Sequence, residues 1–230
     1  MKKLLLVFFL LMAAKITAQN LQLHYDLGED RKYFTTTLEM FKPDEYGSTF
    51  FFVDFDFNMP ENKSISLAYW EIARYVTVYE KLSVTLQYND GFVTIPTPVG
   101  NYSGTLNQSW LAGVSYPIDL GFVTLNTDLL AKKIYKSDGL DVQLTTVWFV
   151  PFLEGKLNFT GFLDIWTQDK NLRAGAIGSD KEMVFLTEPQ LWYNFDKHLS
   201  VGTEIEISNN FLPFQDEIKV NPTIAVKWNF

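Results

Sequence analysis

The sequence predicts an all-β chain that forms a transmembrane, antiparallel, up-and-down β-barrel of about twelve strands. Three observations predict this class. Apolar residues recur at every second position along most of the chain, which is the period of strands. The connections between strands alternate between short and long. The final strand alternates to its last residue, the aromatic Phe230.

The first eighteen residues are expected to form a secretory signal peptide. Lys2 and Lys3 precede an apolar run over residues 4–14, and Ala18 is a small residue suited to the cleavage site. An uncleaved anchor helix is the alternative, but the run is shorter than the ~20 residues that span a membrane, and Lys15 interrupts it. The predicted domains are a signal peptide at 1–18 and a barrel at 19–230.

Composition excludes several classes of function. Residues 1–18 hold three lysines and no acidic residue, so residues 19–230 carry 16 basic and 27 acidic side chains, a formal net charge of −11. A chain this acidic does not present the basic surface that binds nucleic acid. The absence of cysteine excludes disulfides, thiolate chemistry and cysteine-based metal sites.

Twelve segments have strand periodicity. They span residues 20–28, 32–41, 48–58, 64–78, 81–89, 105–116, 120–132, 139–150, 155–167, 182–194, 198–208 and 218–230. An even number of strands is typical of single-chain bacterial barrels.

The segment 48–58 shows how the two faces of a strand differ. Its even-numbered face holds two aromatic rings and two carboxylates: Phe50, Phe52, Asp54 and Asp56. Its odd-numbered face is apolar from Phe51 to Phe57. Because carboxylates need water or partners, the even face is expected to line the interior and the odd face to meet lipid.

Two segments depart from regular alternation. In 64–78, the apolar residues change parity between Tyr69 and Ile72, which predicts a bulge or bend near Trp70–Glu71. In 182–194, Pro189 cannot donate a ladder hydrogen bond, and a closed barrel has no edge strand to accommodate it. A local bulge is expected there.

The connections provide a second signal. The stretches 89–104 and 167–181 are long and rich in Gly, Asn and Asp, whereas 79–81, 117–119 and 196–197 read as tight turns. Outer-membrane barrels have short periplasmic turns and longer outer loops. The pattern therefore predicts that both termini lie in the periplasm.

A soluble β-sandwich is the main alternative, because its strands also alternate. Against it, charged residues recur on one face of most long strands while aromatic residues occupy the other. Six aromatic residues fall near strand ends, where such rings sit at the two membrane interfaces: Trp110, Tyr116, Trp148, Trp192, Tyr193 and Trp228.

The final strand decides between these two classes. An apolar face runs from Val220 to Phe230, with Asn221, Thr223 and Lys227 on the other face. A terminal strand of this kind that closes on Phe resembles the signal by which the outer-membrane insertion machinery recognises its substrates. With the signal peptide, it predicts the outer membrane of a Gram-negative bacterium. The expected partners are outer-membrane lipid, lipopolysaccharide and that machinery.

Four framework segments carry a wider resemblance: Leu21–Gly28, Phe50–Phe57, Tyr69–Arg74 and Leu186–Tyr193. Together they resemble the nucleoside-specific channel-forming (Tsx-like) outer-membrane family, and still more an uncharacterised barrel family related to it. The resemblance implies a monomeric barrel that passively passes small hydrophilic solutes, nucleosides first. A non-transporting structural or surface-interaction barrel is the alternative.

Inward side chains are the candidates for contact with a solute. A twelve-stranded barrel lies between filled eight-stranded and open sixteen-stranded barrels, so any pore should be narrow. The candidate pore-lining residues are Phe50, Phe52, Asp54, Asp56, Glu188, Gln190, Glu204, Glu206 and Lys227. In the alternative interpretation the aromatics fill the interior and the acids pair with Lys and Arg. The resemblance also makes 187–190 a second candidate constriction, with a purely structural kink as the alternative.

No catalytic residue, metal site or cofactor is expected. His24 and His198 lie far apart in the sequence, and neither sits in a serine–histidine motif or at metal-ligand spacing to Asp or Glu. Paired carboxylates such as Glu204 and Glu206 can do acid–base chemistry, but on barrel strands they usually line water. The chain is therefore expected not to be an enzyme.

Overall fold

The chain is almost entirely β-strand. The computed structural model describes residues 19–29, 31–60, 63–172, 180–211 and 217–230, so the expected signal peptide lies outside the described residues. Among the described residues, no helix is long and apolar enough to cross a membrane. The elements are β1 (Gln19–Asp26), β2 (Phe34–Asp44), β3 (Gly47–Phe57), β4 (Leu67–Tyr79), β5 (Leu82–Thr97), β6 (Gly100–Thr105), β7 (Ser109–Asp119), β8 (Thr124–Ile134), β9 (Asp141–Phe152), η1 (Leu153–Gly155), β10 (Leu157–Asp169), η2 (Lys170–Leu172), β11 (Lys181–Thr187), β12 (Gln190–Asn194), β13 (Leu199–Asn209) and β14 (Lys219–Asn229).

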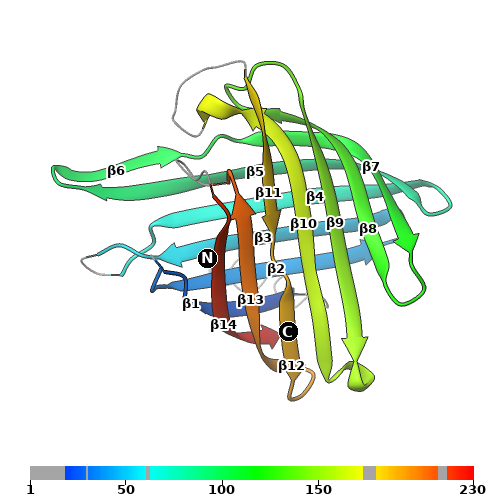
Figure 1. The fold of residues 1–230 in the computed structure, drawn as a ribbon. Helices are drawn as coiled ribbons and strands as arrows, with labels where there is room; N and C mark the ends of the chain where they lie inside the picture. Colours follow the sequence, from blue (N-terminus) through cyan, green and yellow to red (C-terminus); the bar gives the residue numbers. More distant parts are fainter. Residues whose placement is uncertain (1–18, 30, 61–62, 173–179, 212–216) are drawn as a thin grey trace, which may run out of the picture.

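These strands close into one antiparallel barrel with twelve staves (Figure 1). Strand β9 pairs with β10, and β14 pairs with β1, so that the sheet returns to its starting point. Two staves each consist of two strands: β6 and β7 both pair with β5, while β11 and β12 both pair with β10 and β13. The predicted class and strand number are confirmed.

The pairing of β1 with β14 closes the wall. It joins residues from the two ends of the chain, for example Asn20 with Asn229, and the amide of Phe230 donates to the carbonyl of Gln19 at 3.1 Å. Both termini therefore lie at one end of the barrel, which we call the termini end. The opposite end, where β1, β3, β8, β10 and β13 finish, is the loop end.

Alternation along each strand separates the interior from the outer wall. On β1, Leu21 and Leu23 are 44% and 45% exposed, whereas Gln22 and His24 are 2% and 3% exposed. On β14, Ile224 and Val226 are exposed while Thr223 and Ala225 are buried. Side chains of successive strand residues point to opposite faces, so a closed wall places one set inside and the other outside. The outer set is apolar and the inner set mostly polar.

The loop end of the interior is filled on one side by apolar side chains. Ile134, Trp166, Leu172, Val184 and Leu186 form a buried cluster inside β8, β10 and β11, and Phe162 and Phe211 pack against it. This part of the barrel resembles the core of a small filled barrel rather than a wide pore.

The bulge expected near Trp70–Glu71 is wrong. Strand β4 pairs without interruption through these residues with both β3 and β5, and its one irregularity lies between Thr77 and Tyr79. The change of parity arises because the aromatic Tyr69 points inward, where its hydroxyl donates to Glu71, while Ile72 is outward and exposed. An apolar ring inside the barrel was misread as part of the outer face.

Two expected connections are also wrong. The segment 89–104 is a β-hairpin formed by β5 and β6, which projects from the barrel wall (Figure 1). Ile95 and Tyr102, which favour strands, pair across it. Their strand propensity outweighs the Gly- and Asn-rich composition that suggested a loop. Strand β7 runs through Pro117 to Asp119, and the turn follows at 120–123. At 167–181, β10 continues to Asp169 and residues 173–179 lie outside the described residues.

Pro189 interrupts its stave but does not create the expected bulge. Thr187 and Gln190 pair with Leu163 and Thr160 of β10, so three steps on one strand match three steps on the other and no residue is inserted. Regular strand geometry is interrupted only at residues 188–189, where the Glu188 amide still donates to the Phe162 carbonyl at 3.2 Å. The proline removes one donor without shifting the register.

Gly161 makes room for this interruption. A Cβ at position 161 would lie 2.6 Å from the carbonyl oxygen of Glu188 and 2.7 Å from the ring of Trp148, and φ is +151°. Such contacts are closer than real Cβ atoms adopt, and a side chain strains this backbone conformation. The glycine and the proline break are therefore structurally linked.

Gly161→Ala is expected to lower the free energy of unfolding by about 1–3 kcal/mol, because the added methyl overpacks the wall at the break. Urea unfolding of the detergent-refolded protein, followed by tryptophan fluorescence, measures this change. The control is Gly104→Ala, whose Cβ would first meet the ring of Tyr102 at an ordinary 3.4 Å. Equal stability of the two variants would contradict this role for Gly161.

Candidate functional site

All nine candidate pore-lining residues lie on the inward face of the wall. The rings of Phe50 and Phe52 contact each other, and Phe52 contacts inward Tyr69. Asp54 and Asp56 accept hydrogen bonds from Thr37 and Thr35 on β2. The remaining five, Glu188, Gln190, Glu204, Glu206 and Lys227, face inward from β12, β13, β14 and the break before β12.

Five carboxylates are arranged around the interior of the barrel, and we call this set the acidic ring. Its members are Asp54 on β3, Glu71 on β4, Asp164 on β10, Glu188 in the β11–β12 break and Glu204 on β13. Each member lies within electrostatic range of the next around the ring, from Asp54 through Glu71, Asp164, Glu188 and Glu204 back to Asp54. Strands from opposite sides of the wall therefore bring negative charge to a common space.

The ring is enclosed by the wall yet remains partly exposed to solvent. All five members have intermediate exposure, although neighbouring inward residues such as Asn89 and Ser200 are buried. Because these five residues are not fully buried inside a closed wall, the interior beside them is not completely filled.

Most of the ring is held by neutral partners. Thr37 donates to Asp54, Tyr69 and Asn89 donate to Glu71, and Gln190 donates to Glu204. Within the described part of the chain, no ion pair involves Asp54, Glu71, Asp164 or Glu188, and Glu204 has only His24 Nδ1 at 3.9 Å. Much of the ring's charge is therefore not cancelled by direct contact.

Two lysines flank the ring. Lys132 on β8 lies within electrostatic range of Glu71 and Asp164, donates to Gln143 at 2.8 Å, and stacks over Trp166 with Nζ 4.3 Å from the ring centroid. Lys227 on β14 is within range of Glu204 and stacks over Trp192 at 3.8 Å. Five carboxyl groups therefore face two amino groups across this part of the interior.

Glu206 has a different role from Glu204. Arg31, in the connection after β1, binds Glu206 through both terminal nitrogens at 2.9 and 3.0 Å and also reaches Asp26 at 3.2 Å. Asn221 donates to the same carboxylate at 3.1 Å. The alternative in which acids pair with basic residues therefore holds for Glu206, whereas Asp54 and Asp56 pair with threonines.

Trp192 corrects one expectation about the membrane interface. It is fully buried inside the barrel, edge-on to His24 and beneath Lys227, with its indole N–H donating to Gln190 at 2.8 Å. Gly202 permits this position, because a Cβ there would lie 2.5 Å from the indole. Trp110, Tyr116, Tyr193 and Trp228 are exposed, while Trp148 is half-buried against Phe159.

The two histidines have separate surroundings. His24 is buried in the interior between Gln22 and Thr223, with ring nitrogens 2.9 and 3.0 Å from their side-chain oxygens. His198, at the termini end, contacts the carbonyl of Asn229 at 2.7 Å and stacks on Trp228. Among the described residues, no group of three or more His, Cys, Asp or Glu side chains is placed to hold a metal ion.

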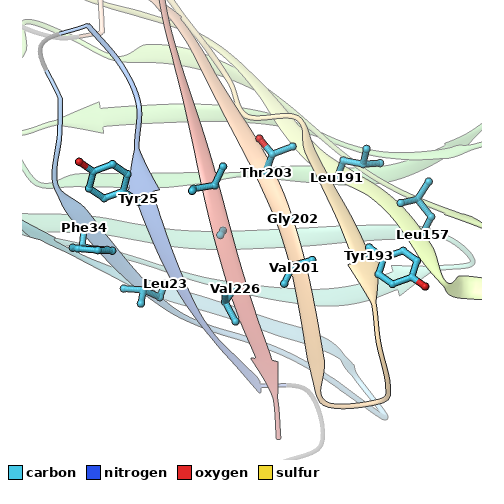
Figure 2. A pocket seen from close by; sticks show the side chains of 12 residues that line it. Leu23, Tyr25, Phe34, Leu157, Leu191, Tyr193, Val201, Gly202, Thr203 and Val226 are labelled. Carbon is cyan, nitrogen blue, oxygen red and sulfur yellow. The ribbon is translucent and has the colours of Figure 1, made fainter.

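A groove of about 540 Å³ lies on the outer wall, not in the interior. Figure 2 shows Leu23, Val201 and Val226 along it, on the outward faces of neighbouring strands, with Tyr25 and Tyr193 towards its two sides. Its lining is almost wholly apolar, which suits hydrocarbon rather than a polar solute. The acidic ring is therefore the better candidate for contact with polar molecules.

Two ring members were absent from the sequence candidates. Glu71 was missed because the parity of its strand was misinterpreted. Ile72, Val76 and Val78 are exposed on the outer face, so Glu71, which has the opposite parity, faces inward. Asp164 on β10 was also missed, because strand periodicity gives the face of a residue but not the stagger that sets its depth along the barrel.

The sequence matches one family over residues 18–230, the family described as Domain of unknown function (DUF5020). The chain belongs to this family. No curated protein matches the sequence.

Solved structures share the fold at low sequence identity. A NanC porin is 9% identical with a TM-score of 0.56, and the match covers 93% of this chain and 100% of that one. A KdgM porin is also 9% identical with a TM-score of 0.52, covering 93% and 99%. LpxR from Salmonella typhimurium is 8% identical with a TM-score of 0.50, covering 93% and 100%. The protein thus has the fold of outer-membrane barrels.

Arg31→Met is expected to destabilise the barrel by up to about 3–5 kcal/mol, because it leaves two largely buried carboxylates without their cation. Urea unfolding measures the loss. The double variant Arg31→Met/Glu206→Gln should regain part of the lost free energy of unfolding, because one of the two carboxylates left without a cation is then removed. Additive losses in the double variant would show that the two side chains do not interact.

Proposed function

We propose that the protein is a passive channel of the Gram-negative outer membrane for small hydrophilic solutes, and that the acidic ring is its selective element. The observation that carries the proposal is a ring of five partly exposed carboxylates enclosed by a closed barrel wall. Rings of Asp and Glu select cations in pores, because they concentrate positive charge where the passage is narrow.

The outer wall supports a membrane location. Outward residues such as Leu23, Ile224 and Val226 are apolar and exposed, and exposed aromatic residues lie near strand ends. The proposal places the termini end in the periplasm, with a monomeric barrel surrounded by outer-membrane lipid and lipopolysaccharide. The β14 strand with Phe230 is the proposed signal to the insertion machinery.

Nucleosides remain a candidate solute because of the framework resemblance. Phe50 and Phe52 offer aromatic surface, and Asp54 and Asp56 offer hydrogen-bond acceptors beside it. A flat base needs such a surface, and its ribose needs acceptors. Replacement of both Asp54 and Asp56 by Ala should abolish nucleoside uptake into proteoliposomes without preventing insertion; unchanged uptake would remove this site from consideration.

A non-transporting barrel is the second candidate function. The observation that favours it is the filling of the interior: Leu111, Leu130, Val184 and Trp192 are at most 1% exposed, and the apolar cluster occupies part of the loop end. Filled interiors are typical of small structural barrels. We propose no catalytic activity for either form.

Ion selectivity in planar bilayers tests the channel. The purified protein should conduct and should favour K⁺ over Cl⁻ by roughly tenfold, because the ring raises the local cation concentration. The triple variant Asp54→Asn/Glu188→Gln/Glu204→Gln should conduct with a permeability ratio near one. Reversal potentials in a KCl gradient measure the ratio.

The control for this experiment is Glu45→Gln, which removes one carboxylate from the exposed turn between β2 and β3. Its permeability ratio should equal that of the wild type. The absence of conductance by folded wild-type protein would favour the non-transporting barrel. Conductance that prefers anions would contradict the assigned role of the ring.

A further inference from the structure

We propose that the acidic ring, together with the rings of Phe52 and Tyr69, forms a site for a small organic cation that carries an ammonium group. This inference rests on the proposed function, because it names the class of solute that would be held at the selective element. Three features of the ring and its surroundings carry it: acceptor oxygens without donors among the described residues, aromatic surface, and carboxylates too dispersed to hold a metal.

Acceptor oxygens beside Glu71 lack donors. Asn89 is only 7% exposed and its Nδ2 donates to Glu71 at 2.9 Å, yet its Oδ1 has no hydrogen-bond partner among the described residues. The buried Oδ1 of Asp164, within electrostatic range of Glu71, also lacks one within the described ranges. A buried acceptor without a donor is destabilising, so each of these two oxygens is complementary to a ligand group that donates an N–H or O–H.

Aromatic surface lies against the same carboxylate. The Phe52 and Tyr69 ring centroids are 5.9 Å apart, and the Tyr69 hydroxyl donates to Glu71. Phe52 on β3 and Glu71 on β4 are also directly opposite each other in the sheet, so the aromatic ring and the carboxylate are cross-strand neighbours. Cations bind over aromatic faces, and quaternary ammonium groups are recognised by rings placed beside acids.

The dispersal of the carboxylates favours an organic cation over a metal ion. The ring draws its members from both sides of the barrel, and no three acidic side chains in the described residues approach closely enough to coordinate one ion. A dehydrated metal ion needs several oxygens at ~2.0–2.6 Å. A cation spread over several carbon and nitrogen atoms needs only a negative field and contact surface.

One relative with the same fold is in complex with a negatively charged ligand. A KdgM porin has been solved with oligogalacturonate, which bears carboxylates. Five ring carboxylates flanked by two lysines would repel such a ligand. The same barrel fold would therefore serve a solute of opposite charge.

Binding of choline and of its neutral isostere 3,3-dimethyl-1-butanol tests the inference. Isothermal titration calorimetry on the full-length barrel in a maltoside detergent should give choline at least about tenfold higher affinity than the isostere. The two molecules have similar shapes, but only choline carries a positive charge. Glu71→Gln and Phe52→Leu should each weaken choline binding about three- to tenfold, with Glu45→Gln unchanged. Circular dichroism first shows that each variant is folded.

Several results would overturn the site. They are equal binding of choline and the isostere, Ca²⁺ binding that excludes choline, or wild-type affinity in both Glu71→Gln and Phe52→Leu. Titration in detergent requires no conductance, so the two proposals fail separately. Choline binding by a barrel that does not conduct would refute the channel alone. A cation-selective channel with no preference for choline would refute the site alone.

Discussion

The structure depends on the antiparallel pairing of β1 with β14. This pairing joins the two ends of the chain and converts an open sheet into a closed wall. Closure satisfies the backbone donors and acceptors of strands that would otherwise form exposed edges, which is what a bilayer demands of any spanning β-structure. It also gives every strand an inside and an outside, so a residue's parity decides whether it faces the outer surface or the interior.

Closure also explains why the interior is electrically unbalanced. The five members of the acidic ring lie on five different segments of the wall, and each is unremarkable on its own segment. When the wall closes, Asp54 comes within range of Glu204, and Asp164 within range of Glu188. Threonine, tyrosine, asparagine and glutamine hold these carboxylates without neutralising them. Arg31 pairs with Glu206, which lies beside the ring towards the loop end.

The alternation of apolar and polar residues was enough to predict the barrel, its twelve staves and the inward placement of residues such as Asp54 and Glu204. Successive residues of a strand point to opposite faces, so the sequence itself shows which residues share a face. It failed where an inward residue was aromatic. Tyr69 and Trp192 were both placed outside, since hydrophobicity alone does not distinguish a ring that meets lipid from one that packs beside a carboxylate or under a lysine. The ring itself was not predicted, because the approach of Asp164 to Glu71 depends on the stagger of strands on opposite sides of the barrel, which periodicity does not give.

Charge-dependent access to the interior tests the acidic, water-filled space most directly. The chain has no cysteine, so Thr37→Cys places a single thiol beside Asp54. A trimethylammonium-ethyl methanethiosulfonate should modify it at least about tenfold faster than the sulfonato-ethyl reagent, because the ring concentrates cations and repels anions. A thiol at exposed Glu45 should show little preference by comparison. No modification of Thr37→Cys by either reagent, or equal rates with both, would contradict an acidic aqueous interior.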